Sequence, residues 1–330
     1  MKLLRILLPT VLAAILAVLP GCKKEDTEIK YMDGYVALSL PHYMQPGESK
    51  SFQIDTMMTL INPAGETIGY YFYDAYRKVS DTLVTADGII RKHIYTYTAP
   101  DALETVKLSF GGFAPKDSKY TSSVASVESV IVLPGLSGDG SITHFDPATS
   151  GTFTDFRDFR EYYYTTIGDL DWMRQNLAWD ESGRPYDDCE IMTDVFGRYY
   201  TWEEAQDACP FGWRLPTDAE WTALQAGTEA GEDIEGLAGK MMGDLYFNGT
   251  KMWEYWREVK ISDEFLFSAM PVGYRAGGIF DGTYTYAVFW TSDEENGLGV
   301  CRYIYQEKDI IYRGRMSKTD FAASVRCVRE

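Results

Sequence analysis

Apolar residues follow three different patterns along this chain of 330 residues. An almost unbroken apolar run covers residues 3–19 near the amino terminus, and no second run of that length follows. Between residues 31 and 134 the apolar positions form short runs separated by polar turns. From residue 148 onward such runs are mixed with helical signals. The pattern therefore predicts a leader followed by two folded parts of different character.

The short runs of the first part have the composition of β-strands. They are rich in β-branched and aromatic residues, and turn signals such as Pro46-Gly47 and Asp87-Gly88 separate them. We expect strands at residues 34–40, 51–54, 68–73, 94–98, 106–110 and 127–132. Strands at this density predict an immunoglobulin-like β-sandwich at residues 31–134. The segment contains no cysteine, so such a sandwich lacks an inter-sheet disulfide.

The second part carries helix signals as well as strand signals. A glycine-rich and serine-rich run begins at Pro134, so we place a linker at residues 135–147 and a second domain at residues 148–330. Threonine followed by glutamate three residues later forms a capping box, which predicts helices starting at Thr201 and Thr217. Tyrosine-rich or β-branched runs predict strands at residues 162–167, 287–290, 300–305 and 323–328. These signals predict an α+β domain with long loops between residues 227 and 289.

The apolar leader has the features of an export signal. Lys2 and Arg5 make the start of the leader positively charged, and the apolar run ends at the sequence Leu-Pro-Gly-Cys with the cysteine at position 22. This ending resembles the lipobox of bacterial lipoproteins, which implies a signal peptide at residues 1–21 and lipidation of Cys22. The alternative is a transmembrane helix, but the run is short for a span and contains Pro9.

The segment after Cys22 bears on localisation. Residues 22–30 form a charged tether, and Lys24-Glu25-Asp26 resembles the surface-export signal of Bacteroidota-type lipoproteins. We therefore expect an outer-membrane protein that is anchored by lipid and exposed at the cell surface. The alternative is that these charges only keep the tether solvated.

Charge and composition exclude further classes. The formal net charge is −18, and no basic patch is visible, so binding to nucleic acid or to an anionic bilayer through a basic surface is not expected. The chain has 24 tyrosines, 16 phenylalanines and 8 tryptophans, which supply enough apolar area for a folded core. The acidic surface indicates a soluble body held at a membrane by lipid alone.

Seven separated motifs in the second part resemble one known family. They are GTFTD at 151–155, WMRQNL at 172–177, GRYYTW at 197–202, CPFGWRLPT at 209–217, FSAMPVGYR at 267–275, FWTS at 289–292 and SVRCV at 324–328. Together they resemble the Fibrobacter succinogenes major paralogous domain over residues 151–330. The resemblance implies a C-type-lectin-like α+β fold, related to that of formylglycine-generating enzymes, and implies no settled activity. Core positions are expected for four tryptophans: Trp172, Trp202, Trp213 and Trp221.

Four cysteines remain once Cys22 is assigned to lipid. All lie in the second part, and in an exported protein an even number predicts disulfides, for which three pairings exist. The resemblance to C-type-lectin-like folds implies a bond between Cys209 and Cys327, which leaves Cys189 to pair with Cys301.

Catalytic signals are sparse. His42, His93 and His144 all precede the second domain, and no zinc motif is present. The redox pattern of formylglycine-generating enzymes is not found, and the carboxylates show no spacing typical of glycoside hydrolysis. We expect neither enzyme activity nor a cofactor. The acidic loop at residues 293–296, with three acidic side chains and Asn296, leaves calcium as an alternative, although such a run is usually a solvated face.

Aromatic residues in and beside the long loops are the candidate ligand-binding residues. Trp253 and Trp256 are three positions apart, which on a helix places both rings on one face. The full set of candidates is Trp253, Trp256, Tyr246, Tyr255, Tyr284 and Tyr286. Such rings stack on sugars, so the sequence favours a cell-surface glycan-binding protein. One alternative is an adhesion or assembly protein with a protein partner, and another is that the rings pack on the domain body.

Overall fold

The structure is a computed structural model that describes residues 30–31, 41–54, 68–74, 77–85, 93–113, 120–121, 123–131, 145–229 and 231–330. Residues 30–31, 52–95 and 110–131 are described by their backbone alone where they are included. Several predictions lie outside the described residues. These are the signal peptide at 1–21, the lipidated Cys22, the tether up to residue 29, the strand at 34–40 and residues 135–144 of the linker.

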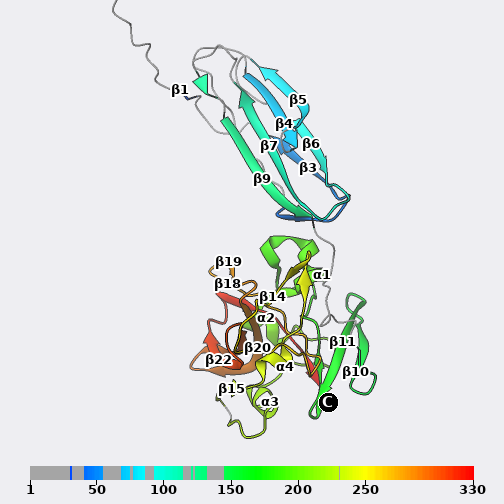
Figure 1. The fold of residues 1–330 in the computed structure, drawn as a ribbon, viewed down its shortest axis with the longest axis vertical. Helices are drawn as coiled ribbons and strands as arrows, with labels where there is room; N and C mark the ends of the chain where they lie inside the picture. The colour runs from blue at the N-terminus through cyan, green and yellow to red at the C-terminus, as the bar shows by residue number, and fades with distance from the viewer. Residues whose placement is uncertain are drawn as a thin grey trace, which may run out of the picture.

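The described chain up to residue 131 consists of strands. Five form a sheet in the order β2-β9-β7-β4-β5, and β3 pairs separately with β6. Figure 1 shows these long strands gathered in one body. All their pairings are antiparallel except β2 with β9. The bounds are β2 (Tyr43–Met44), β3 (Ser49–Ile54), β4 (Ile68–Asp74), β5 (Arg77–Thr85), β6 (His93–Thr98), β7 (Thr105–Phe113) and β9 (Ser123–Ile131).

Five predicted strands correspond to β3, β4, β6, β7 and β9, whereas β5 was not expected. Its sequence is mostly charged and polar, with Val79, Leu83 and Val84 as its apolar residues and no aromatic residue. It lies at the edge of the five-stranded sheet, where one side has no strand neighbour. A short parallel pair, β1 (Lys30–Tyr31) with β8 (Tyr120–Thr121), completes the described strands of this half.

The second half combines antiparallel sheets with short helices, so the whole molecule is rich in β-structure. One sheet has the order β10-β11-β12-β24, in which the last strand of the chain returns to the start of this half. Its bounds are β10 (Ser150–Asp155), β11 (Arg160–Ile167), β12 (Leu170–Met173) and β24 (Val328–Arg329). Within the described residues, no helix has the length and apolar character needed to cross a membrane.

Two further sheets and a hairpin complete this half. The order β15-β22-β21-β20 comprises β15 (Ile234–Glu235), β22 (Ile310–Met316), β21 (Leu298–Tyr305) and β20 (Tyr286–Glu295). The order β13-β14-β23-β18-β19 comprises β13 (Arg184–Pro185), β14 (Arg198–Thr201), β23 (Phe321–Ala323), β18 (Tyr274–Ala276) and β19 (Ile279–Asp281). The hairpin is β16 (Tyr246–Phe247) with β17 (Thr250–Lys251).

The helices begin where the capping boxes predicted. In α2 (Trp202–Gln206) the Thr201 hydroxyl accepts from the Glu204 amide, and the Glu204 carboxylate accepts from the Thr201 amide. The same reciprocal pair starts α3 (Asp218–Ala223). Both predicted helix starts are confirmed, and α2 ends at Gln206. The other short helices are α1 (Thr193–Phe196), α4 (Ala238–Met241), η2 (Tyr186–Asp188) and η3 (Glu190–Met192).

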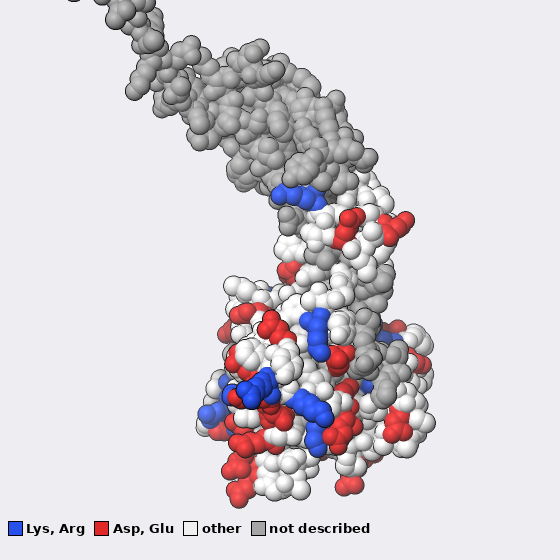
Figure 2. Space-filling model, viewed as in Figure 1, with Lys and Arg blue, Asp and Glu red and all other residues white. Residues whose placement is uncertain are grey.

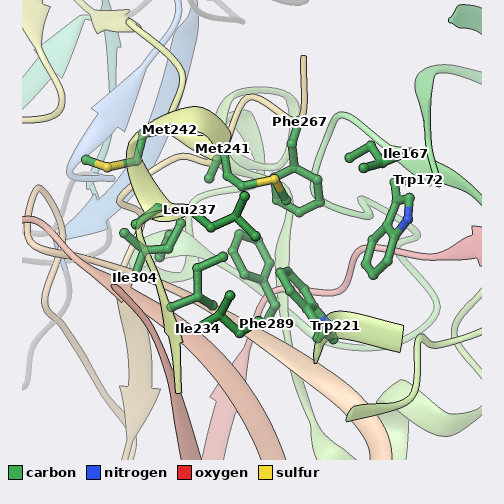
Figure 3. Packing of buried hydrophobic residues seen from close by; sticks show 14 of the residues in the cluster. Ile167, Trp172, Trp221, Ile234, Leu237, Met241, Met242, Phe267, Phe289 and Ile304 are labelled. Atoms are coloured by element: carbon green, nitrogen blue, oxygen red, sulfur yellow. The ribbon is translucent and has the colours of Figure 1, made fainter. Parts of the chain in front are cut away.

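The tryptophans form the core, as the sequence predicted. Trp172, Trp213 and Trp221 are buried, and Trp202 is half-buried with its indole N–H donating to the Thr291 carbonyl. Figure 3 shows Trp221 beside Phe289 in the largest apolar cluster of the described residues. The centroids of these two rings are 5.7 Å apart. Burial of this much aromatic area supplies the main favourable term for folding.

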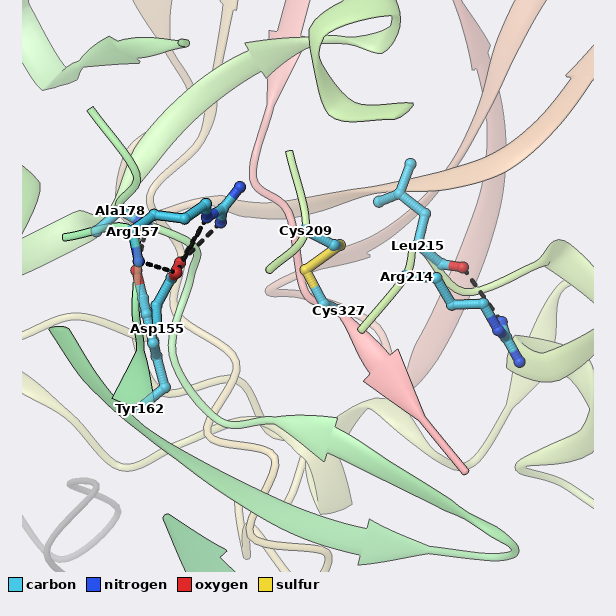
Figure 4. Close-up of a disulfide and its surroundings, with 8 residues drawn as sticks. All are labelled: Asp155, Arg157, Tyr162, Ala178, Cys209, Arg214, Leu215 and Cys327. Carbon is cyan, nitrogen blue, oxygen red and sulfur yellow. Dashed lines mark hydrogen bonds and ion pairs between the residues drawn. A yellow bond between two sulfur atoms is a disulfide. The ribbon is translucent and has the colours of Figure 1, made fainter. Parts of the chain in front are cut away.

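One predicted disulfide is present and the other is not. Cys209 and Cys327 are bonded, with their Cα atoms 5.9 Å apart, which ties the segment that follows α2 to the chain before β24 (Figure 4). The predicted bond between Cys189 and Cys301 is wrong, because both are free, buried cysteines. They lie in different apolar clusters: Cys189 packs near Phe196, whereas Cys301 lies on β21.

The two halves are in contact at β2. The Tyr43 ring centroid is 5.9 Å from that of Tyr186 and 6.4 Å from that of Phe247. Beside this aromatic contact, the His42 imidazole pairs with the Asp187 carboxylate. Tyr43 therefore extends an apolar cluster of the second half into the first.

Candidate functional site

The two tryptophans of the predicted binding face do not form one. Trp253 is 0% exposed, and its indole N–H donates to the Ala269 carbonyl over 2.9 Å. Trp256 is half-buried against the same cluster. No helix is present at residues 253–256, so the predicted helical face is wrong. The loop instead folds over the core, because the removal of a tryptophan ring from water is favourable.

Three of the tyrosine candidates are scattered. Tyr255 is 85% exposed, whereas Tyr246 on β16 is half-buried. Tyr284 is half-buried and lies with Tyr43 and Phe247 around a shallow hollow between the two halves. These side chains have no common surface that would hold one ligand.

Tyr286, the remaining candidate, belongs to a row of five tyrosines on neighbouring strands. Its ring centroid is 5.1 Å from that of Tyr305, 6.1 Å from Tyr274 and 6.3 Å from Tyr303. Tyr303 in turn stacks on Tyr312 at 5.1 Å. All five side chains are half-buried. We call this set, Tyr274, Tyr286, Tyr303, Tyr305 and Tyr312, the tyrosine ladder.

The ladder results from strand register. Tyr286 lies directly opposite Tyr305, and Tyr303 lies directly opposite Tyr312. Side chains alternate between the two faces of a strand, so Ile304 between the two tyrosines of β21 points into the opposite core. A row of aromatic rings therefore lies on one face of β20, β21 and β22, and Tyr274 of β18 extends it.

A glycine makes room for two of the rings. Gly282 follows β19 and has a φ of +73°, a left-handed conformation that favours glycine. A Cβ atom added there would lie 2.9 Å from the Tyr286 ring and 3.1 Å from the Tyr274 ring. The absence of a side chain in the turn before β20 therefore allows the rings of Tyr274 and Tyr286 to occupy these positions.

Comparison with known families bears on the same region. The model of the Fibrobacter succinogenes major domain matches residues 165–329, which include the whole tyrosine ladder and both disulfide cysteines. The chain belongs to this family. It has no significant match among curated proteins or among solved structures. The resemblance expected from the seven motifs is thus confirmed for the family.

The ladder of this Fibrobacter succinogenes major domain offers hydroxyl groups as well as ring surface. A hydrogen bond to Glu307 raises the pKa of Tyr305 to about 12, and burial raises the pKa of Tyr303 and Tyr274. These three phenols keep their protons at neutral pH; the Tyr305 hydroxyl donates to Glu307, and each phenol oxygen can still accept a hydrogen bond. Stacked rings that carry phenol groups suit a ligand that is apolar on one side and polar at its edges.

Four residues of the ladder were not recognised from the sequence: Tyr274, Tyr303, Tyr305 and Tyr312. The alternation of Tyr303 and Tyr305 around Ile304 is the one local signal, because it places both rings on the same face of a strand. Which strands lie beside β21 is a property of the folded domain, and no residue pattern in the sequence states it.

The acidic residues after Trp290, considered for calcium, have other partners. The Asp293 carboxylate accepts from the Asp218 amide, and Glu294 pairs with Lys318. Glu295 bonds Arg313 and Arg315, and the hydrogen bond from Arg313 lowers the pKa of Glu295. In the part of the chain that the structure describes, no group of three or more His, Cys, Asp or Glu residues is arranged to hold a metal ion. Calcium binding stays untested.

Proposed function

We propose that this protein is a non-catalytic binding protein that recognises carbohydrate at the tyrosine ladder. The observation that carries the proposal is the contiguous row of five half-buried tyrosines on β18, β20, β21 and β22. Rings that already pack against one another lose little conformational freedom on binding, so more of the contact energy appears as affinity. Sugar rings have apolar C–H faces and hydroxyl edges, which match rings and phenol groups.

The proposed setting is the cell surface. The Leu-Pro-Gly-Cys ending of the leader supports lipid attachment at Cys22, and the Lys24-Glu25-Asp26 step supports export to the outer face of the outer membrane. In this proposal the first half is an immunoglobulin-like spacer, and the major domain, with a C-type-lectin-like fold, presents the ladder. Acidic and basic side chains intermingle on the face of the major domain in Figure 2, which favours a neutral or weakly charged ligand over a polyanion.

The test is retention of the full chain in affinity gels that contain defined polysaccharides. Tyr305→Ala and Tyr312→Ala remove outer rings of the ladder, and each is expected to weaken binding about tenfold or more. Tyr305→Phe keeps the ring and removes the hydroxyl, so a smaller loss is expected.

The matched control is Tyr255→Ala, an exposed tyrosine outside the ladder, which is expected to bind as the wild type does. A wild-type protein that no polysaccharide retards would contradict the proposal. So would equal losses in Tyr255→Ala and Tyr305→Ala.

A second function, adhesion or surface assembly through a protein partner, is favoured by a different feature. In the turn between β10 and β11, Phe156 is 81% exposed and Phe159 is 77% exposed. Two exposed phenylalanines at one tip are unusual for a solvated loop and typical of contact residues. Cross-linking on intact cells tests this function, since the double variant Phe156→Ser and Phe159→Ser should lose a specific protein adduct that Tyr305→Ala retains.

A further inference from the structure

The basic residues of β21 and β22 lie on the face of the sheet opposite the tyrosine ladder. Side chains on one face of a strand recur at every second position. Arg302 of β21 and both Arg313 and Arg315 of β22 alternate with the ladder tyrosines, so they point to the opposite face. There Arg302 and Arg313 bond Asp218, and Arg315 bonds Glu295. The third strand, β20, contains no basic residue.

Two further basic residues close to the ladder in sequence have partners of their own. Lys308 follows β21 and pairs with Glu258. Arg275 alternates with Tyr274 on β18, and its guanidinium lies 5.7 Å from the centroid of the Phe280 ring. On the described strands of the ladder, no basic group is therefore placed to hold an acidic sugar.

Carboxylates, in contrast, lie at the edges of the ladder. Asp281 of β19 is directly opposite Tyr274 of β18, and residues opposite each other in an antiparallel pair share a face. Glu307 follows β21 and accepts a hydrogen bond from the Tyr305 hydroxyl. A carboxylate has about four acceptor positions, so one that already accepts from a phenol can accept from a ligand as well.

The phenols respond to these negative charges. Burial and, to a smaller extent, the charge of Asp281 raise the pKa of Tyr274. The hydrogen bond to Glu307 is the main cause of the raised pKa of Tyr305. A negative potential that disfavours a phenolate favours a cation at the same place.

We propose that the tyrosine ladder prefers glycans that contain amino sugars, with a protonated sugar amine bound by Glu307 or Asp281. The inference rests on the function proposed for the ladder, because it names the class of carbohydrate that the same rings hold. An ammonium group donates hydrogen bonds and carries the charge that these carboxylates attract. An amide or a hydroxyl at the same ring position offers a donor without the charge.

Three trisaccharides test the preference. Cellotriose, the trimer of N-acetylglucosamine and the trimer of glucosamine share one linkage. They differ only in the group on one ring carbon of each unit, which is a hydroxyl, an acetamide or an amine. Calorimetric titration of the full chain at mildly acidic pH, where the amine is protonated, is expected to show about fivefold tighter binding of the glucosamine trimer at low ionic strength. High salt should reduce this difference, because solvent-exposed ion pairs are screened.

Variants assign the preference to the two carboxylates. Glu307→Gln and Asp281→Asn keep the size of each side chain and remove its charge, so each should reduce the preference and the double variant should abolish it. Glu161→Gln is the matched control, since it removes one exposed charge on β11, in a sheet that contains no ladder residue. The control should keep the full preference, whereas a general attraction of this acidic chain for cations would be reduced equally in all single variants.

The outcomes separate this inference from the function on which it rests. Equal affinity for the three trimers, or tighter binding of a neutral one, overturns the preference and leaves carbohydrate binding at the ladder intact. An unchanged preference in the double variant, or an equal loss in Glu161→Gln, also overturns it. Failure of the glucosamine trimer to bind overturns it as well, and the polysaccharide gels test the proposed function independently.

Discussion

Trp253 and Tyr255 lie two positions apart in one loop, yet their side chains have opposite environments. Trp253 is fully buried in the largest apolar cluster, and Tyr255 is 85% exposed. Truncation of Trp253 to alanine leaves a cavity and removes the hydrogen bond to Ala269, so we expect a loss of about 3–5 kcal/mol in the free energy of unfolding. Tyr255→Ala should change it by no more than about 0.5 kcal/mol. Urea unfolding followed by tryptophan fluorescence measures both.

The same pair shows what residue spacing can and cannot predict. Two tryptophans three positions apart predict a shared face only if the backbone is helical, and residues 253–256 are not. Trp253 is buried because Ile234, Phe267 and Ile304 reach the same cluster from distant parts of the chain. A loss of glycan binding in Trp253→Ala would therefore report unfolding. If Trp253→Ala unfolded with the same free energy as Tyr255→Ala, the assignment of Trp253 to the core would be contradicted.

At the scale of elements, α3 begins with a capping box. The first residue of the helix, Asp218, also belongs to a buried ion cluster. The Thr217 hydroxyl accepts from the Glu220 amide over 3.2 Å. Removal of this acceptor in Thr217→Ala should lower the free energy of unfolding by about 1 kcal/mol, whereas Thr217→Ser keeps the acceptor and should stay close to the wild type. Chemical denaturation of the three proteins measures the difference. Equal stability of the alanine and serine variants would show that the box contributes nothing.

The elements differ in how far the sequence predicts them. The reason is the separation along the chain between the residues that make the contact. Both capping boxes were predicted because donor and acceptor lie three residues apart. The ion cluster at Asp218 was not, since its partners Arg302 and Arg313 come from β21 and β22, more than 80 residues away. The tyrosine ladder needs β20, β21 and β22 in one register and Tyr274 from β18 of another sheet, and the β-branched pattern of each strand fixes only which residues share a face. The family motifs supplied the Cys209–Cys327 bond, but no pattern indicated that Cys189 and Cys301 lie in separate clusters.

For the whole molecule, the large number of packed tyrosines has a consequence at high pH. Burial raises the pKa of Tyr162, Tyr199 and Tyr200 above the usual value of about 10. An unfolded chain releases these phenol protons as the pH passes about 10, whereas the folded protein keeps them. The unfolded state then binds fewer protons than the native state, so the free energy of unfolding falls as the pH rises above 10. Below that pH these groups are neutral in both states and contribute no slope.

We therefore expect the thermal unfolding midpoint to fall gently from about pH 8.5, because burial also raises the pKa of the free thiols of Cys189 and Cys301, and to fall steeply above 10. Circular dichroism melts at fixed ionic strength measure it. Tyr199 is fully buried and bonds the Val272 carbonyl, so Tyr199→Phe should lower the midpoint at pH 8 and make the fall above pH 10 shallower. Tyr255→Phe, at an exposed site, should alter neither. A midpoint that stays constant up to pH 11, or an unchanged slope in Tyr199→Phe, would refute the role assigned to buried phenols.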